Sequence, residues 1–229
     1  MLSGGNAGHM KFAYRTGARM GNGIGKLTTA DRRMDALLIE AQEYFMGAGG
    51  IHDAAAAIAR RFDQLDIDYA VAGALALGQH GFKRLTTDVD ILIRREDLAR
   101  FKERWLGRGY VDVRPGGKAI RDTTHDVKID FLLTGDFPGD GHPKPVAFPD
   151  PSSAAVEGAK YRIVSLSALI ELKLASGMTA PHRMHDLADV LRLIRETRLA
   201  RTFGSELDPY VRTKFDELWT LAQHPDEDY

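Results

Sequence analysis

Two segments in which acidic and apolar residues alternate constrain the fold of this 229-residue chain more than any other feature. Residues 88–93 read DVDILI, and residues 126–133 read DVKIDFLL. Successive side chains of a β-strand point to opposite faces of the sheet. We therefore predict two strands, each with one apolar face. Asp88 and Asp90 then lie on the polar face of the first strand, and Asp130 lies on the polar face of the second.

Three carboxylates in this arrangement suit divalent metal ions. Neighbouring carboxylates repel each other unless a cation or a proton lies between them. Mg²⁺ takes one or two carboxylates and completes its shell with substrate phosphates, and Mn²⁺ is the alternative ion. Asp88, Asp90 and Asp130 are predicted to hold two ions, one activating the attacking oxygen and one stabilising the leaving phosphate. The alternative is a strand end whose aspartates point into water, because a DxD pattern alone is not specific.

A recognisable order of motifs surrounds these strands. Residues 69–72 predict a short apolar strand, which Gly73 ends, and Arg84 lies in a polar segment before Asp88. The order of Gly73, Arg84, the acidic pair and a lone later aspartate resembles the nucleotidyltransferases of the DNA polymerase β superfamily. The similarity is strongest to small bacterial members, the antibiotic nucleotidyltransferases and the abortive-infection toxins, and it covers residues 65–193.

The resemblance implies a reaction and its partners. An enzyme of the EC 2.7.7 type would move a nucleoside monophosphate from an NTP such as ATP to a hydroxyl of an acceptor. The acceptor would be tRNA, a protein or a small molecule. The resemblance is also compatible with a toxin of a toxin–antitoxin system, with either an antitoxin or a second copy of the chain as partner. An antibiotic-modifying adenylyltransferase and a phosphohydrolase that uses water as the acceptor are alternatives.

The resemblance also assigns nucleotide-binding residues, namely Gly73, Ala74, Arg84, Thr87 and Lys173. The family usually has serine or glycine where this chain has Ala74, which keeps the backbone NH but lacks a hydroxyl. This departure favours the alternative of a catalytically inactive nucleotidyltransferase fold that serves as a binding or regulatory module. The family often has a further acid early in a later helix, and both Asp186 and Asp189 fit that position.

Lys173 is informative without the resemblance. Ser165 is a predicted N-cap of a helix in which Leu169 and Ile170 share one face with Lys173. A lysine on an apolar face is unfavourable unless its charge meets an anion or reaches water. Either the side chain extends to solvent, or it faces the cleft and holds nucleotide phosphates. The second interpretation predicts that Lys173→Met folds as stably as the wild type but binds NTP less tightly.

The remaining periodicities predict an α+β protein. The resemblance implies a polymerase-β-like core, with a small mixed sheet and flanking helices, and a helical C-terminal part follows it. The predicted divisions are a flexible leader (1–27), a nucleotidyltransferase core with N-terminal helices (28–152) and a mainly helical part that completes the cleft (153–229). Predicted helices include residues 30–46, 53–65, 96–108, 186–198 and 206–222, and further predicted strands are 110–114, 118–121 and 161–164.

Composition narrows the environment and the partners. The chain has no cysteine, which excludes disulfides and thiolate metal sites and fits a cytoplasmic location. It has no apolar run of the roughly 20 residues that a membrane-spanning helix needs, so we expect no membrane partner. Its net charge is −1, but residues 160–201 hold eight Lys and Arg against four Asp and Glu. That local excess favours RNA over a protein or a small molecule as the acceptor.

Overall fold

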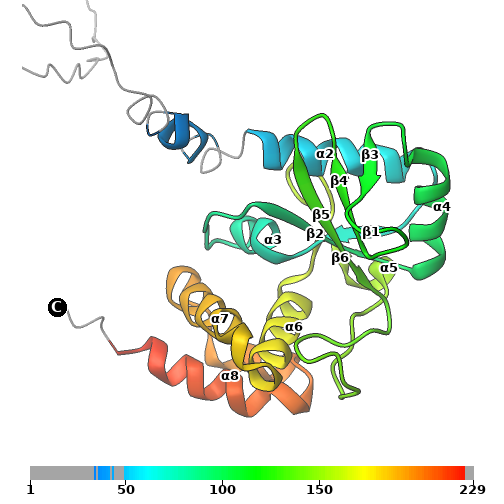
Figure 1. Ribbon diagram of the computed structural model, residues 1–229. Helices are drawn as coiled ribbons and strands as arrows, with labels where there is room; N and C mark the ends of the chain where they lie inside the picture. The colour runs from blue at the N-terminus through cyan, green and yellow to red at the C-terminus, as the bar shows by residue number, and fades with distance from the viewer. Residues whose placement is uncertain (1–33, 35, 42, 44–48, 225–229) are drawn as a thin grey trace, which may run out of the picture. The chain divides into compact units, whose positions relative to one another are not determined.

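The computed structural model describes residues 34, 36–41, 43 and 49–224 (Figure 1). The chain divides into two compact units, Met1–Leu37 and Leu38–Tyr229, and the fold given below is that of the second. The predicted leader lies outside the described residues. Of the predicted helix 30–46, residues 34, 36–41 and 43 are helical, and the rest also lies outside them.

A seven-stranded mixed sheet with the order β3-β4-β5-β2-β1-β7-β6 organises the Leu38–Tyr229 unit (Figure 1). Its central strands β2 and β5 are parallel, whereas β1 runs antiparallel to β2 and parallel to β7. The strands are β1 (Tyr69–Val71), β2 (Asp88–Ile93), β3 (Tyr110–Asp112), β4 (Ala119–Asp122), β5 (Val127–Leu133), β6 (Ala155–Val156) and β7 (Ile163–Val164).

Helices flank this sheet and make up most of the chain after it. Helix α2 packs on β1, β2 and β5, and helices α6, α7 and α8 pack on one another. Figure 1 shows the last three as a separate yellow-to-red group. The helices are α2 (Gly50–Asp63), α3 (Gly73–Gln79), α4 (Arg95–Trp105), α5 (Pro151–Ala154), α6 (Leu166–Thr179), α7 (Met184–Thr197) and α8 (Pro209–Ala222), with 3₁₀ turns at Pro181–Arg183 and Arg201–Glu206.

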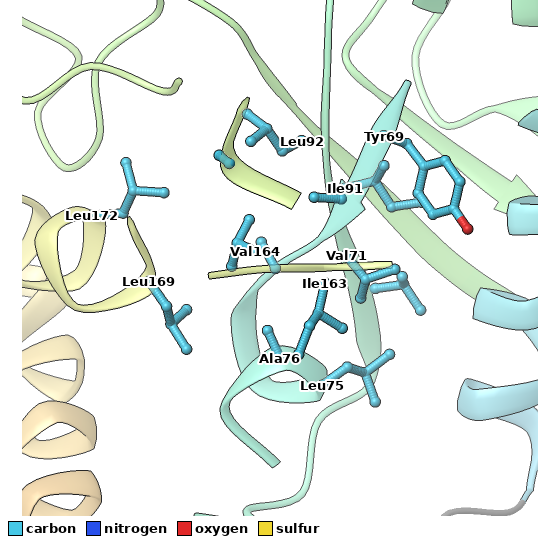
Figure 2. Close-up of a cluster of buried hydrophobic side chains, with 14 of the residues drawn as sticks. Tyr69, Val71, Leu75, Ala76, Ile91, Leu92, Ile163, Val164, Leu169 and Leu172 are labelled. Atoms are coloured by element: carbon cyan, nitrogen blue, oxygen red, sulfur yellow. The ribbon is translucent and has the colours of Figure 1, made fainter. Parts of the chain in front are cut away.

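One cluster of buried apolar side chains holds these layers together. On the α2 and α4 side, Phe101 is central: its ring centroid lies 5.0 Å from that of Phe62 and 6.3 Å from that of Phe131. Elsewhere, Leu169 and Leu172 of α6 lie on the side of that helix toward the strands, in one cluster with residues of β1, β2 and β7 (Figure 2). The sheet therefore joins α2 and α4 to the C-terminal helices.

The predicted α+β class, with a small mixed sheet, flanking helices and a helical C-terminal part, is confirmed. The sheet continues past residue 152, however, because β6 and β7 belong to it. The last helix starts at Pro209 and not at residue 206, since Asp208 caps it by accepting a hydrogen bond from the Tyr210 amide. Among the described residues, no helix has both the length and the apolar character needed to cross a membrane.

Candidate active site

The pairing of β2 with β5 brings the three predicted carboxylates together. In the parallel register Asp90 lies opposite Asp130, and Asp88 lies opposite Lys128. Burial alternates along β5, where Val127, Ile129, Phe131 and Leu133 are buried and Lys128 and Asp130 are only partly buried. Asp88, Asp90 and Asp130 therefore lie on one face of the sheet.

This face forms one wall of a cavity of about 680 Å³. Most of the residues that the sequence singled out line it: Gly73, Ala74, Arg84, Asp88, Asp90, Asp130, Lys173 and Asp186. Thr87 is exposed and does not line the cavity, whereas its neighbour Thr86 does. Sequence reasoning also missed three cationic lining residues, Lys118, Lys128 and Arg183.

Gly73 is required by its closeness to Asp90. Its φ is +57°, in the left-handed region that favours glycine. A Cβ at this position would lie 1.9 Å from Oδ2 of Asp90 and 2.9 Å from its Cγ. The start of α3 therefore fixes where the Asp90 carboxyl can lie.

We expect Gly73→Ala to lower the free energy of unfolding more than Gly107→Ala does. Gly107 also has a positive φ, +75°, but a Cβ there would meet no atom within 4 Å. Both variants carry the cost of alanine in the left-handed region, which is roughly 1–2 kcal/mol. Only Gly73→Ala also displaces a carboxyl group, for a further loss of about 1–3 kcal/mol. Denaturant titration of the two variants measures the difference, and equal losses would contradict this placement of Gly73.

The carboxylate cluster holds more negative charge than its neighbours balance. Burial, and after it the charges of Asp88 and Asp130, raise the pKa of Asp90 to about 6, although Lys173 and Arg183 act in the opposite direction. Asp88 accepts a hydrogen bond from Oγ1 of Thr86 at 2.6 Å. The fold thus disfavours the ionised form of Asp90 as long as no further cation is bound.

The chemistry of these donors fits a divalent ion. All three side chains offer the hard carboxylate oxygens that Mg²⁺ and Mn²⁺ prefer, and the charges of Asp88 and Asp130 help to raise the pKa of Asp90, a repulsion that a cation would relieve. Within the described part of the chain, however, no three acidic or histidine side chains are arranged as a ready metal site. One reason is visible at Asp130, whose Oδ2 accepts a hydrogen bond from Nζ of Lys128 at 2.7 Å.

Lys173 corrects the sequence analysis in two respects. First, α6 is not apolar on one face only: residues from Leu169 to Gly177 are almost all buried, because the helix lies among α3, α7 and α8. Second, the ammonium group neither reaches solvent nor stands free in the cavity. It donates hydrogen bonds to Oδ1 of Asp186 at 3.0 Å and to Oδ2 of Asp189 at 2.7 Å.

Asp186 and Asp189 connect this lysine to two arginines of the cavity wall. Nε of Arg84 donates to both carboxylate oxygens of Asp189, at 2.9 and 3.1 Å. Nε of Arg183 donates to Oδ2 of Asp186 at 2.8 Å, and the Ser176 hydroxyl donates to the same oxygen at 2.7 Å.

The two acids and the lysine are almost completely buried, with exposed fractions of 1% for Asp186, 4% for Asp189 and 6% for Lys173. Burial alone would raise the pKa of Asp186, but Lys173, Ser176 and Arg183 together hold it below its usual value. Both aspartates that the sequence left as alternatives therefore take part in one buried network.

Comparisons with known proteins add little to this geometry. No protein-family model matches the chain, and no curated protein matches it. A crystal structure of ANT(2'')-Ia in complex with adenylyl-2''-tobramycin is 16% identical over 68% of this chain and 91% of its own, with a TM-score of 0.45. A solution structure of ANT(2'')-Ia is 17% identical over 70% of this chain and 76% of its own, with a TM-score of 0.33.

JHP933 from Helicobacter pylori is 13% identical over 73% of this chain and 90% of its own, with a TM-score of 0.31. Likenesses at this level carry no functional argument. The assignment of a function therefore rests on the residues of the cavity.

Proposed function

We propose that this chain is a metal-dependent nucleotidyltransferase. It would move a nucleoside monophosphate from an NTP to a hydroxyl of an acceptor and release pyrophosphate. The observation that carries the proposal is the placement of Asp88, Asp90 and Asp130 on one sheet face, at the wall of a cavity of about 680 Å³. The raised pKa of Asp90 adds to it, because a partly buried cluster of carboxylates that disfavours its own ionisation is a suitable place for a cation.

In this proposal the three aspartates hold divalent ions, which supply activation of the attacking oxygen and charge neutralisation at the leaving phosphate. Asp130 orients the acceptor hydroxyl and accepts its proton. The hydroxyl oxygen forms a bond to the α-phosphorus as the bond from that phosphorus to the pyrophosphate oxygen breaks. Arg84, Arg183 and Lys118 bind the anionic triphosphate from the cavity wall. Gly73 and Ala74 let the phosphates approach the backbone beside Asp90.

Lys173 takes a different role from the one that the sequence suggested. Its bonds go to Asp186 and Asp189, and these two acids hold Arg183 and Arg84. We therefore assign Lys173 as a positioning residue, which acts on the nucleotide through the two arginines.

The charge of the cavity bears on the acceptor. Five lysine and arginine side chains line it, against four carboxylates. Once metal ions balance the carboxylates, the wall is positive, which attracts a phosphate-bearing acceptor and repels a polycation such as an aminoglycoside. RNA is therefore the acceptor that we propose. The role in a toxin–antitoxin system remains an implication of the sequence resemblance alone.

The test is a labelling experiment with each of the four NTPs, Mg²⁺ and, in separate reactions, tRNA, a cell protein extract or an aminoglycoside. We expect label from one or more NTPs to enter the RNA fraction, and Asp88→Asn to abolish it. Label in the aminoglycoside would overturn the choice of acceptor but not the reaction. Release of phosphate with no labelled acceptor would indicate the phosphohydrolase alternative.

NTP binding without turnover in any reaction would indicate the inactive module. Ala74→Ser is the matched variant for that alternative, because it adds the hydroxyl that the family usually has. If the missing hydroxyl at position 74 is the cause of the inactivity, Ala74→Ser should gain turnover.

A further inference from the structure

Lys128 lies directly beside the carboxylate cluster, on the same face of the sheet. It precedes Asp130 by two residues on β5, so the two side chains share a face, and it lies opposite Asp88 in the register with β2. Its Nζ lies 2.7 Å from Oδ2 of Asp130, with 40% of the lysine side chain and 29% of the aspartate side chain exposed.

The electrostatics agree with this placement. The hydrogen bond to Asp130 is the largest cause that raises the pKa of Lys128, and the charges of Asp130, Asp88 and Asp90 raise it further. A lysine ammonium is charged at neutral pH, and here it contacts one of the three acids that are the proposed metal ligands. A lysine ammonium and a divalent ion both neutralise the charge of a carboxylate cluster. The two therefore compete for Oδ2 of Asp130.

We propose that Lys128 is an internal counterion of the metal site. In the metal-free protein it holds Oδ2 of Asp130, and a divalent ion that uses this oxygen together with Asp88 and Asp90 must displace the ammonium. Lys128 then sets the metal concentration at which the site assembles. This inference rests on the proposed metal-dependent function and deepens it, because it names a positioning residue that neither the sequence pattern nor the resemblance assigned.

Lys118 provides a matched control. It immediately precedes β4, the strand that pairs antiparallel with β5, and it lines the same cavity. Its ammonium, however, pairs with Asp136, a residue outside the cluster, which also pairs with Arg95. Removing the charge of Lys118 changes the overall charge of the cavity as much as removing that of Lys128, but leaves Asp130 bound.

The experiment measures Mn²⁺ binding by the loss of the free-ion EPR signal, and Mg²⁺ binding by the shift in melting temperature, both without nucleotide. We expect Lys128→Met to half-saturate with Mn²⁺ at a concentration about tenfold below wild type, the effect of one competing charge-assisted contact. In EDTA it should melt below wild type, because three carboxylates then lack their counterion, and Mg²⁺ should raise its melting temperature more. Lys118→Met should bind Mn²⁺ within about twofold of wild type.

Lys128→Arg keeps a cation at this position and should bind Mn²⁺ close to wild type, which a purely steric role of the lysine stem would not explain. If Asp88→Asn abolishes Mn²⁺ binding while Lys128→Met binds as wild type does, the counterion role is overturned and the proposed function stands. If wild type binds Mn²⁺ no better than Asp88→Asn, the metal site itself is wrong and both proposals fail.

Discussion

Asp90→Asn is expected to lower nucleotidyl transfer by roughly 10³-fold or more, while the metal-free protein becomes more stable. The loss of turnover follows from the removal of a proposed ligand from the centre of the cluster. The gain in stability follows from the raised pKa of Asp90, which lies at about 6 in the folded protein against an ordinary value of 3.8. The fold thus favours the neutral form that asparagine mimics.

The sign of this effect depends on pH in a defined way. A carboxyl group whose pKa is raised by folding is neutral below its unfolded pKa, where it does not oppose folding. The stability that the neutral Asp90 carboxyl group contributes is lost as the pH rises toward and through its folded pKa of about 6. At pH 7 and above, Asp90→Asn should therefore add up to about 3 kcal/mol to the free energy of unfolding, and near pH 4 it should add little.

Thermal and denaturant unfolding in EDTA at pH 4 and pH 7.5, with turnover measured in Mg²⁺, check both parts. Asp112→Asn is the matched control, because it removes a carboxylate of the same sheet. The hydrogen bond from Lys102 lowers the pKa of the Asp112 carboxyl group, so here the fold favours the ionised form. Asp112→Asn should be slightly destabilising and leave turnover unchanged. Near wild-type turnover of Asp90→Asn, or a less stable metal-free protein, would count against the metal-ligand role.

The sequence predicted the strands of the site well because their signal is local. A period of two along residues 88–93 and 126–133 is enough to assign a face to Asp88, Asp90 and Asp130. The same alternation already placed Lys128 on the face of Asp130, so a closer reading of the pattern could have found that pair. Whether two side chains on one face form a hydrogen bond depends on their rotamers, which alternation does not determine.

The network around Lys173 could not be predicted in the same way. Its partners lie 13 and 16 residues later, on α7, and the contact exists only because α6 and α7 pack on each other. An apolar stripe shows that a lysine is in an unusual position but does not identify its counterion. The sequence could not decide between Thr86 and Thr87 either. The conformation of a segment without regular structure determines that Thr86 is the one that forms a hydrogen bond with Asp88.

Lys173→Met is expected to destabilise the protein by about 3–5 kcal/mol, the usual result of removing one partner from a buried ion pair. Asp186 and Asp189 are 1% and 4% exposed and would lose their shared cation. Arg183 and Arg84 still contact these acids, which places the loss toward the lower end of that range. For a chain of this size, the melting temperature should fall by on the order of 10 °C.

The matched control is Lys214→Met, which removes a lysine from a pair with Glu217 at the surface and should change the free energy of unfolding by less than about 1 kcal/mol. The double variant Lys173→Met with Asp189→Asn should recover part of the loss, because it removes one of the two unbalanced carboxylates. NTP binding to Lys173→Met should weaken as well. Without Lys173, Asp186 and Asp189 are held less firmly, and these two acids position Arg183 and Arg84. A Lys173→Met protein that melts at or above the wild-type temperature would mean that the ammonium faces solvent or the cavity, as the sequence alone suggested, and that the buried network is not what fixes the two arginines.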